Sequence, residues 1–202
     1  MFSLPQSTEI RKQISKKLIY SKFTAELKGE RKTQFDDDIS KIVILNEISP
    51  ASINIQEGEQ VKAIFVVQVV LKEKNYNERN LVLLSKLFGQ NMIFVLQYEE
   101  EYQLAIYQTR LLASDWYEEE IKLAITGLSL DKVWEQMVSQ ISGIVASDEN
   151  TLDEQIALEE QKTQLKNKIT ELEKKARKEV QSKRKYEMFQ RMKEYQKQLE
   201  EL

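Results

Sequence analysis

The chain ends in TLDEQIALEEQKTQLKNKITELEKKARKEVQSKRKYEMFQRMKEYQKQLEEL, residues 151–202. This segment contains neither Gly nor Pro and is rich in Glu, Lys, Gln, Leu and Arg, which all favour helix. Thr151 and Glu154 fit a capping box at its start. We therefore predict a long basic amphipathic helix over residues 151–202, about 75 Å in length. Such a helix would extend past any compact body of this size, so we expect it to contact a partner or a second copy of the chain.

Apolar side chains recur along this segment every three or four residues. Their mean period of about 3.7 residues predicts a nearly straight, coiled-coil-like helix with a polar break around residues 181–185. We predict that this stripe binds a protein partner or forms a homodimer; the alternative is a helix that folds back on its own body. The predicted partner-contact residues are Leu165, Ile169, Leu172, Val180, Met188, Met192, Tyr195 and Leu199.

The same segment is strongly basic. Residues 162–197 hold 13 Lys or Arg against 5 Glu, a local charge of +8, and the whole chain carries −3, so the remainder carries −11. This asymmetry favours an anionic partner, although a solvated helix has the same composition. A DNA-binding adaptor that grips backbone phosphates is therefore the competing hypothesis. Its possible nucleic-acid contacts are Lys174, Lys175, Arg177, Lys178, Lys183, Arg184 and Lys185.

The residue types that the chain lacks narrow its chemistry. Its 202 residues include no Cys and no His, which excludes disulfides, ordinary zinc sites and imidazole-activated nucleophiles. We expect no enzymatic activity, no cofactor, and no catalytic or metal-binding residues. A Mg²⁺-dependent nuclease built on Asp115, Glu120 and Lys122 is a minor alternative. Glu-x-Lys tripeptides recur by chance in a chain that is 31% charged, so this pattern is weak.

No apolar run approaches the length of a membrane span, and the first residues lack the apolar core of a signal peptide. The expectation is a cytoplasmic protein with no membrane partner.

The remainder, residues 1–146, is predicted to be an α+β domain joined to the helix by a hinge at 147–150. The strongest strand signal is the β-branched run at residues 61–71. A hairpin is expected at 92–108, and a helix with one apolar face after Ser129. Five or six strands in a mixed or mainly antiparallel sheet, with flanking helices, follow from this order.

Weaker signals give four further expectations. Ile10, Ile14 and Leu18, spaced by four, predict a first helix. The three Asp residues at 36–38 are expected in the first turn of a short helix, where they would complement its dipole. Residues 52–55 and 120–126 are expected to be strands.

The ordered set of motifs resembles the bacterial family called domain of unknown function 4391. The resemblance covers essentially the whole chain and rests on Leu4-Pro5, residues 35–42, 48–55, 61–71, 92–96 and 127–131, and the Lys-rich C-terminal segment. The family has no agreed activity, and its members are similar in being encoded beside helicases and methyltransferases in restriction-like loci. The resemblance implies a non-enzymatic accessory or scaffolding subunit of a DNA-directed, anti-phage defence complex, with a helicase or methyltransferase subunit as its partner.

Overall fold

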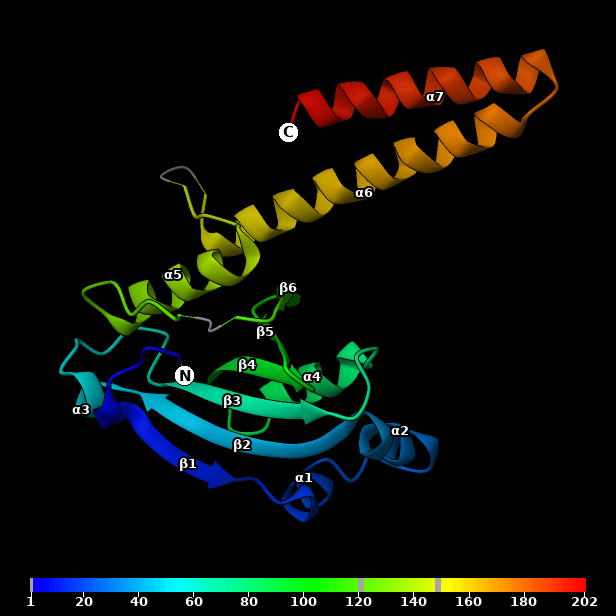
Figure 1. Ribbon diagram of the computed structural model, residues 1–202. Helices are drawn as coiled ribbons and strands as arrows, with labels where there is room; N and C mark the ends of the chain where they lie inside the picture. The colour runs from blue at the N-terminus through cyan, green and yellow to red at the C-terminus, as the bar shows by residue number, and fades with distance from the viewer. Residues whose placement is uncertain (1, 120–121, 148–149) are drawn as a thin grey trace. The chain divides into compact units, whose positions relative to one another are not determined.

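The structure is a computed structural model that describes residues 2–119, 122–147 and 150–202. It divides into two compact units, Met1–Val145 and Ala146–Leu202. We call the first the sheet domain and the second the helical hairpin (Figure 1).

The sheet domain is built on a six-stranded sheet whose spatial order equals its order in the chain. All neighbouring strands are antiparallel except β3 and β4, which are parallel and are connected through α4 (Glu78–Ser85). This mixed sheet with flanking helices confirms the predicted α+β class. The strands are β1 (Glu9–Gln13), β2 (Ile39–Ile48), β3 (Ile64–Leu71), β4 (Asn91–Tyr98), β5 (Glu101–Tyr107) and β6 (Leu111–Tyr117).

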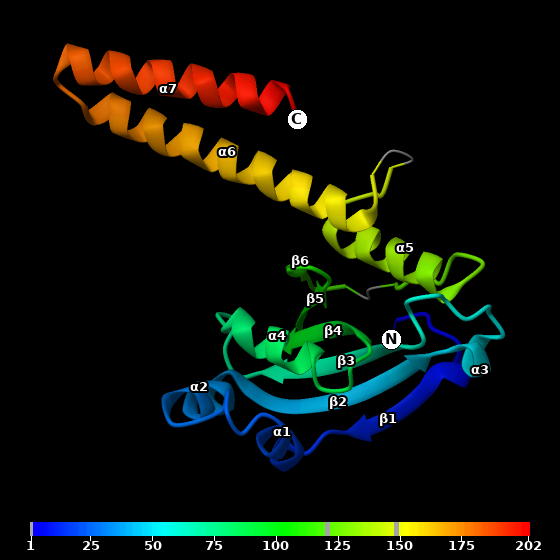
Figure 2. The same cartoon turned by 180° about the vertical axis from the view of Figure 1, so that it is seen from behind.

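Helices cover both faces of the sheet, which explains the continuous apolar run of β3. On one face Val67, Val69 and Leu71 join a core cluster with α1 (Lys16–Lys22), α2 (Glu30–Asp38) and α4. Because side chains alternate along a strand, Ile64 and Val66 point to the other face. Figures 1 and 2 show α5 (Leu130–Ser142) on the opposite side of the sheet from α1 and α2.

The helix expected after Ser129 is α5, and its predicted apolar face is buried. It contacts β5 and β6, and the Trp134 indole donates a hydrogen bond to Gln108 Oε1 at 2.7 Å. The helix ends at Gly143, whose φ of +72° is the left-handed conformation that Gly adopts readily. Its buried residues are Leu130, Val133, Trp134, Met137, Val138 and Ile141.

Asp131, in the first turn of α5, fastens the loop that precedes β3. Its carboxylate accepts hydrogen bonds from the backbone N–H groups of Glu59, Gln60 and Val61 at 2.7, 3.2 and 2.8 Å. Burial would raise the pKa of Asp131, but the three backbone hydrogen bonds outweigh it and lower the pKa below its ordinary value. A Cβ at Gly58 would lie 2.3 Å from Asp131 Oδ1, so the loop needs Gly at this position.

The prediction of a first helix that includes Ile10, Ile14 and Leu18 is wrong. Residues 9–13 pair with β2 as β1, and α1 begins only after Ser15, whose hydroxyl accepts the Lys17 N–H at 3.2 Å. Ile10 and Leu18 are 39% and 48% exposed, so their spacing does not mark a buried helical face.

The acidic run at residues 36–38 lies in the last turn of α2, not in a first turn. At this end of the helix the dipole does not favour negative charge, and hydrogen bonds from specific donors stabilise two of the carboxylates instead. Asp36 accepts hydrogen bonds from Tyr20 and Lys16, and Asp38 accepts them from the Asn77 backbone at 2.9 Å and the Asn80 amide at 2.6 Å. The run therefore ties the end of α2 to α1 and to the start of α4.

Two predicted strands are also wrong. Residues 50–53 form the short helix α3 (Pro50–Ile53), followed by Asn54 in the left-handed conformation. Residues 122–126 are irregular, and residues 120–121 lie outside the described residues. The sixth strand is β6, where Ser114 and Asp115 interrupt the apolar pattern that would have predicted it.

Candidate functional site: the basic tip of the helical hairpin

A long helix follows the sheet domain, as expected, but it does not continue through residue 202. α6 (Leu152–Lys178) ends, residues 179–181 form a turn, and α7 (Ser182–Glu200) returns beside α6. Figure 1 shows this antiparallel arrangement. The prediction of one uninterrupted helix over residues 151–202 is therefore corrected to a hairpin.

The start of α6 confirms the predicted capping box. The Thr151 hydroxyl accepts the Glu154 N–H at 3.4 Å, and the Glu154 carboxylate accepts the Thr151 N–H at 2.8 Å. The carboxylate also accepts the Thr151 hydroxyl at 2.9 Å, and its two hydrogen bonds from Thr151 lower the pKa of Glu154. The helix thus begins where the sequence predicts.

The turn at residues 179–181 is formed without Gly or Pro. Glu179 and Gln181 have extended backbone angles, and the Glu179 carboxylate accepts the Gln181 N–H at 2.9 Å. A loop of this length is common between antiparallel helices. A single helix would leave the apolar stripe in water. In the hairpin, the part of the stripe on α6 packs against the part on α7, and each Å² of apolar surface removed from water stabilises the fold by roughly 25 cal/mol.

The hairpin uses most of the predicted contact stripe internally. Leu165 and Met192 are 9% and 7% exposed, and Ala176 is 2% exposed. Lys168 Nζ lies 5.5 Å from the Tyr195 ring centroid, which joins the two helices. The stripe residues that are half-buried are Ile169, Leu172, Met188, Tyr195 and Leu199.

Val180 is the exception within the stripe. It sits in the turn and is 92% exposed. The hairpin thus removes seven of the eight predicted contact residues from full exposure and leaves Val180 at its apex.

The turn also gathers the predicted nucleic-acid contacts at one end of the hairpin. Four of these cations lie in the last part of α6 and three in the first turn of α7, so folding back makes neighbours of two separate stretches. All seven are exposed. We call this cluster the basic tip: Lys174, Lys175, Arg177, Lys178, Lys183, Arg184 and Lys185.

The basic tip carries a high local charge. Residues 174–187 include its seven cations and two acids, Glu179 and Glu187, which gives +5. Lys175 pairs with Glu171 at 3.5 Å, but both side chains are largely exposed, so this pair neutralises the tip little. The arrangement suits a polyanion better than a single small anion.

Two aromatic residues lie beside the tip: Tyr186, which the sequence already places directly after the cations at 183–185, and Phe189, which sequence reasoning did not single out. Tyr186 and Phe189 are 64% and 45% exposed on α7. Single exposed apolar residues are common on protein surfaces, but these two lie three residues apart on one helix and adjoin the cations. Their helical spacing, taken with their position outside the apolar stripe, was the available signal.

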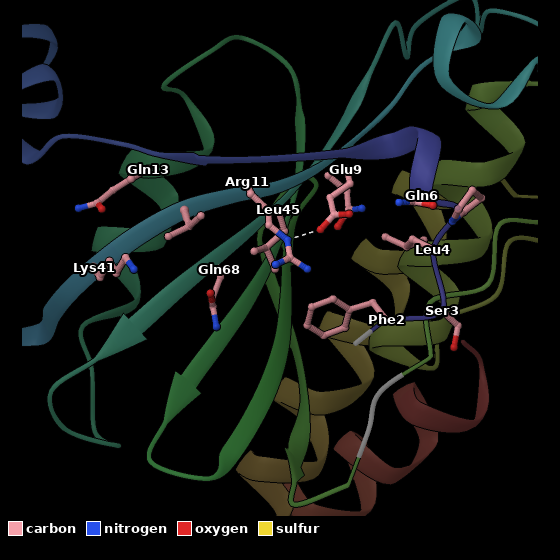
Figure 3. Close-up of a pocket in the computed structure, with 13 residues that line it drawn as sticks. Phe2, Ser3, Leu4, Gln6, Glu9, Arg11, Gln13, Lys41, Leu45 and Gln68 are labelled. Carbon is pink, nitrogen blue, oxygen red and sulfur yellow. Dashed lines mark ion pairs between the residues drawn. The ribbon is translucent and has the colours of Figure 1, made fainter.

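The sheet domain has a cavity of about 610 Å³ between residues 2–6 and strands β1 to β3 (Figure 3). Arg11, at an irregularity of β1, has a φ of +50° and pairs with Glu9. Gln68 on the cavity floor donates to Gln97 Oε1 at 2.7 Å, and Asn46 donates to Thr8 Oγ1 at 2.8 Å. Gln68, Asn46 and Arg11 thus already have partners within the protein, so the cavity offers a weaker case for a ligand than the tip.

Within residues 2–119, 122–147 and 150–202, no group of three or more Asp or Glu side chains could hold a metal ion. Asp115 lies on β6 and Lys122 in an irregular segment, whereas Glu120 is outside the described residues. Of the helices that the structure describes, none is both long and apolar enough to cross a bilayer.

The fold and the site define a chain of two parts, an α+β sheet domain and a helical hairpin with a basic tip. The chain belongs to the family described as domain of unknown function (DUF4391), whose profile matches residues 2–199. The match spans the sheet domain and nearly all of the hairpin, so both parts are family features. No curated protein and no solved structure matches the chain.

Proposed function

We propose that the protein is a non-enzymatic accessory subunit of a bacterial DNA-directed defence complex, and that it binds nucleic-acid backbone through the basic tip. The observation that carries this proposal is the gathering of seven exposed cations, with a local charge of +5, at one end of the hairpin. The role in a defence complex is proposed because the chain resembles a family whose members are encoded beside helicases and methyltransferases.

Duplex DNA carries one negative charge per roughly 1.7 Å of its axis and holds a layer of condensed counterions. Cations that contact phosphates release these counterions, so affinity falls steeply as salt rises. The basic tip would therefore bind with little dependence on base sequence. This mode suits an accessory subunit that holds DNA for a partner.

The test is charge reversal at the start of α7. We expect Lys183→Glu, Arg184→Glu and Lys185→Glu together to lower affinity for a labelled 20-base-pair duplex at least tenfold at low salt. The slope of log affinity against log salt should fall by about 3, near 0.9 for each lost phosphate contact. Fluorescence anisotropy over a series of salt concentrations measures both quantities.

The matched control reverses three exposed lysines of the sheet domain, Lys12→Glu, Lys17→Glu and Lys28→Glu. It changes net charge by the same amount away from the tip, so it should leave the salt slope unchanged. Equal losses in both triple variants would mean that net charge, rather than the tip, governs binding and would overturn the proposal.

A second candidate is protein scaffolding through the same end of the hairpin. Val180, Tyr186 and Phe189 are exposed there, and large exposed apolar side chains favour protein contacts. The occupant would be a second copy of the chain or a helicase or methyltransferase subunit. If the chain is dimeric by light scattering, Val180→Asp with Tyr186→Asp should yield monomers, with little effect of salt on the wild-type dimer. A dimer that survives these changes would contradict this candidate.

A further inference from the structure

One flank of α7 combines lysines and aromatic rings. Lys183, Tyr186, Phe189 and Lys193 follow one another at spacings of 3, 3 and 4 residues. Residues three or four apart on a helix are neighbours on its surface. We call these four residues the aromatic flank; all four are exposed.

The aromatic flank is distinct from the side of α7 that packs on α6. Met188, Met192 and Tyr195 follow the buried stripe, and Phe189 lies about 100° further around the helix than Met188. Tyr186 and Phe189 differ by about 60°. Neither ring has an aromatic or cationic partner among the described residues. The two rings therefore lie off the side of α7 that packs on α6 and keep 64% and 45% of their surface exposed.

We infer that the basic tip prefers single-stranded nucleic acid, with unpaired bases stacked on Tyr186 and Phe189 and the adjoining phosphates held by lysines. This inference rests on the proposed function and specifies its substrate class. Unpaired bases expose their flat faces, and a basic groove with aromatic side chains is the common way to bind them without sequence preference. In a duplex those faces are already stacked inside the helix.

Charge complementarity favours this ligand over an apolar protein surface. The two rings are flanked by Lys183 and Lys193 and adjoin the +5 tip, so any surface that covers them must also accommodate several cations. A single strand of nucleic acid presents both unstacked bases and phosphates, so it can contact the rings and the cations together.

The experiment measures binding of the full-length protein to a labelled 20-nucleotide oligothymidylate and to a 20-base-pair duplex at one salt concentration. We expect tighter binding to the single strand. Tyr186→Ala with Phe189→Ala should weaken single-strand binding by about tenfold or more and leave duplex binding within about twofold. Tyr186→Trp with Phe189→Trp should preserve the preference, since Trp also stacks on bases.

The matched control is Tyr117→Ala with Leu128→Ala, which removes two exposed apolar side chains from the sheet domain. It should leave both affinities unchanged. Circular dichroism of each variant checks that the hairpin remains helical, which is expected because Tyr186 and Phe189 are exposed.

The outcomes separate this inference from the proposed function. If the triple charge reversal weakens both ligands but the double alanine variant is silent, the single-strand inference is wrong and the proposed function stands. If the charge reversal affects neither ligand, the proposed function is wrong as well. Tight, tip-dependent binding to vesicles of anionic phospholipid, without binding to either nucleic acid, would also overturn both.

Discussion

Asp131 accepts hydrogen bonds from three consecutive backbone amides and so holds the loop before β3 in place. We expect Asp131→Asn to lower the free energy of unfolding at pH 7 by about 1–3 kcal/mol, because hydrogen bonds to a charged acceptor are lost. Urea denaturation followed by tryptophan fluorescence measures this loss.

The stabilisation that the Asp131 carboxylate provides should decrease as the pH falls. Because the folded-state pKa of Asp131 lies below its ordinary value of 3.8, the carboxylate stabilises the fold fully above about pH 5. Its contribution disappears as pH falls below 3.8 and through the lowered pKa, so wild type and variant should converge in acid. Asp37→Asn, at an exposed position of α2, is the control and should change little at either pH. A gap between wild type and Asp131→Asn that persists in acid would contradict this account.

Elements with strong periodicity could be predicted from the sequence, and those that depend on tertiary partners could not. α5, β3 and the β4–β5 hairpin carry long apolar patterns, and the structure confirms them. β1, by contrast, consists of five exposed residues. It is a strand because it pairs with the edge of β2, and its own sequence has no apolar pattern that would predict it.

The candidate site could be predicted only in part, because its residues are local in sequence but their arrangement depends on tertiary packing. The seven cations of the basic tip could be named from composition, but their gathering depends on the turn at residues 179–181. That turn lacks Gly and Pro, and the favourable hairpin packing, rather than a local breaker, selects it. Glu171 and Lys175, four residues apart on α6, form an ion pair at 3.5 Å, whereas Glu179 and Lys183 have the same spacing but are separated by the turn.

Packing between α6 and α7 should stabilise the hairpin, and Leu165 is one of the side chains buried in it. Leu165→Asp should destabilise it by about 2–3 kcal/mol, because a charge would replace a side chain that is only 9% exposed. Helical signal at 222 nm and resistance to proteolysis within residues 150–202 should both fall. Val180→Asp, at a position 92% exposed, is the matched control and should leave both unchanged. A Leu165→Asp protein as helical and as resistant as wild type would contradict the packing described.

At the scale of the whole molecule, the core cluster that packs with α1, α2 and α4 is drawn entirely from residues 14–105, and the buried face of α5 on the other side lies within residues 130–141. We therefore expect a chain that ends at Ser147 to fold. Trp116 and Trp134, the chain's only two tryptophans, both lie in the sheet domain and report on it. Their emission maximum and cooperative urea transition should survive the truncation. Emission like that of the unfolded chain would show that the sheet domain needs the hairpin.

The agreement between strand order in space and in the chain has a consequence for how the domain forms. The separation along the chain between paired residues differs among the strand pairs: it is at most 13 residues for β4–β5 and 15 for β5–β6, but 27 for β3–β4 and 30–37 for β1–β2. The β4–β6 meander is therefore local, whereas the parallel β3–β4 pairing requires the connection through α4 to close first. Because contacts that are distant along the chain form slowly, we expect the β4–β6 meander to form early and β1 to join late, so α4 residues such as Leu81 and Leu84 should influence the transition state more than residues of β1.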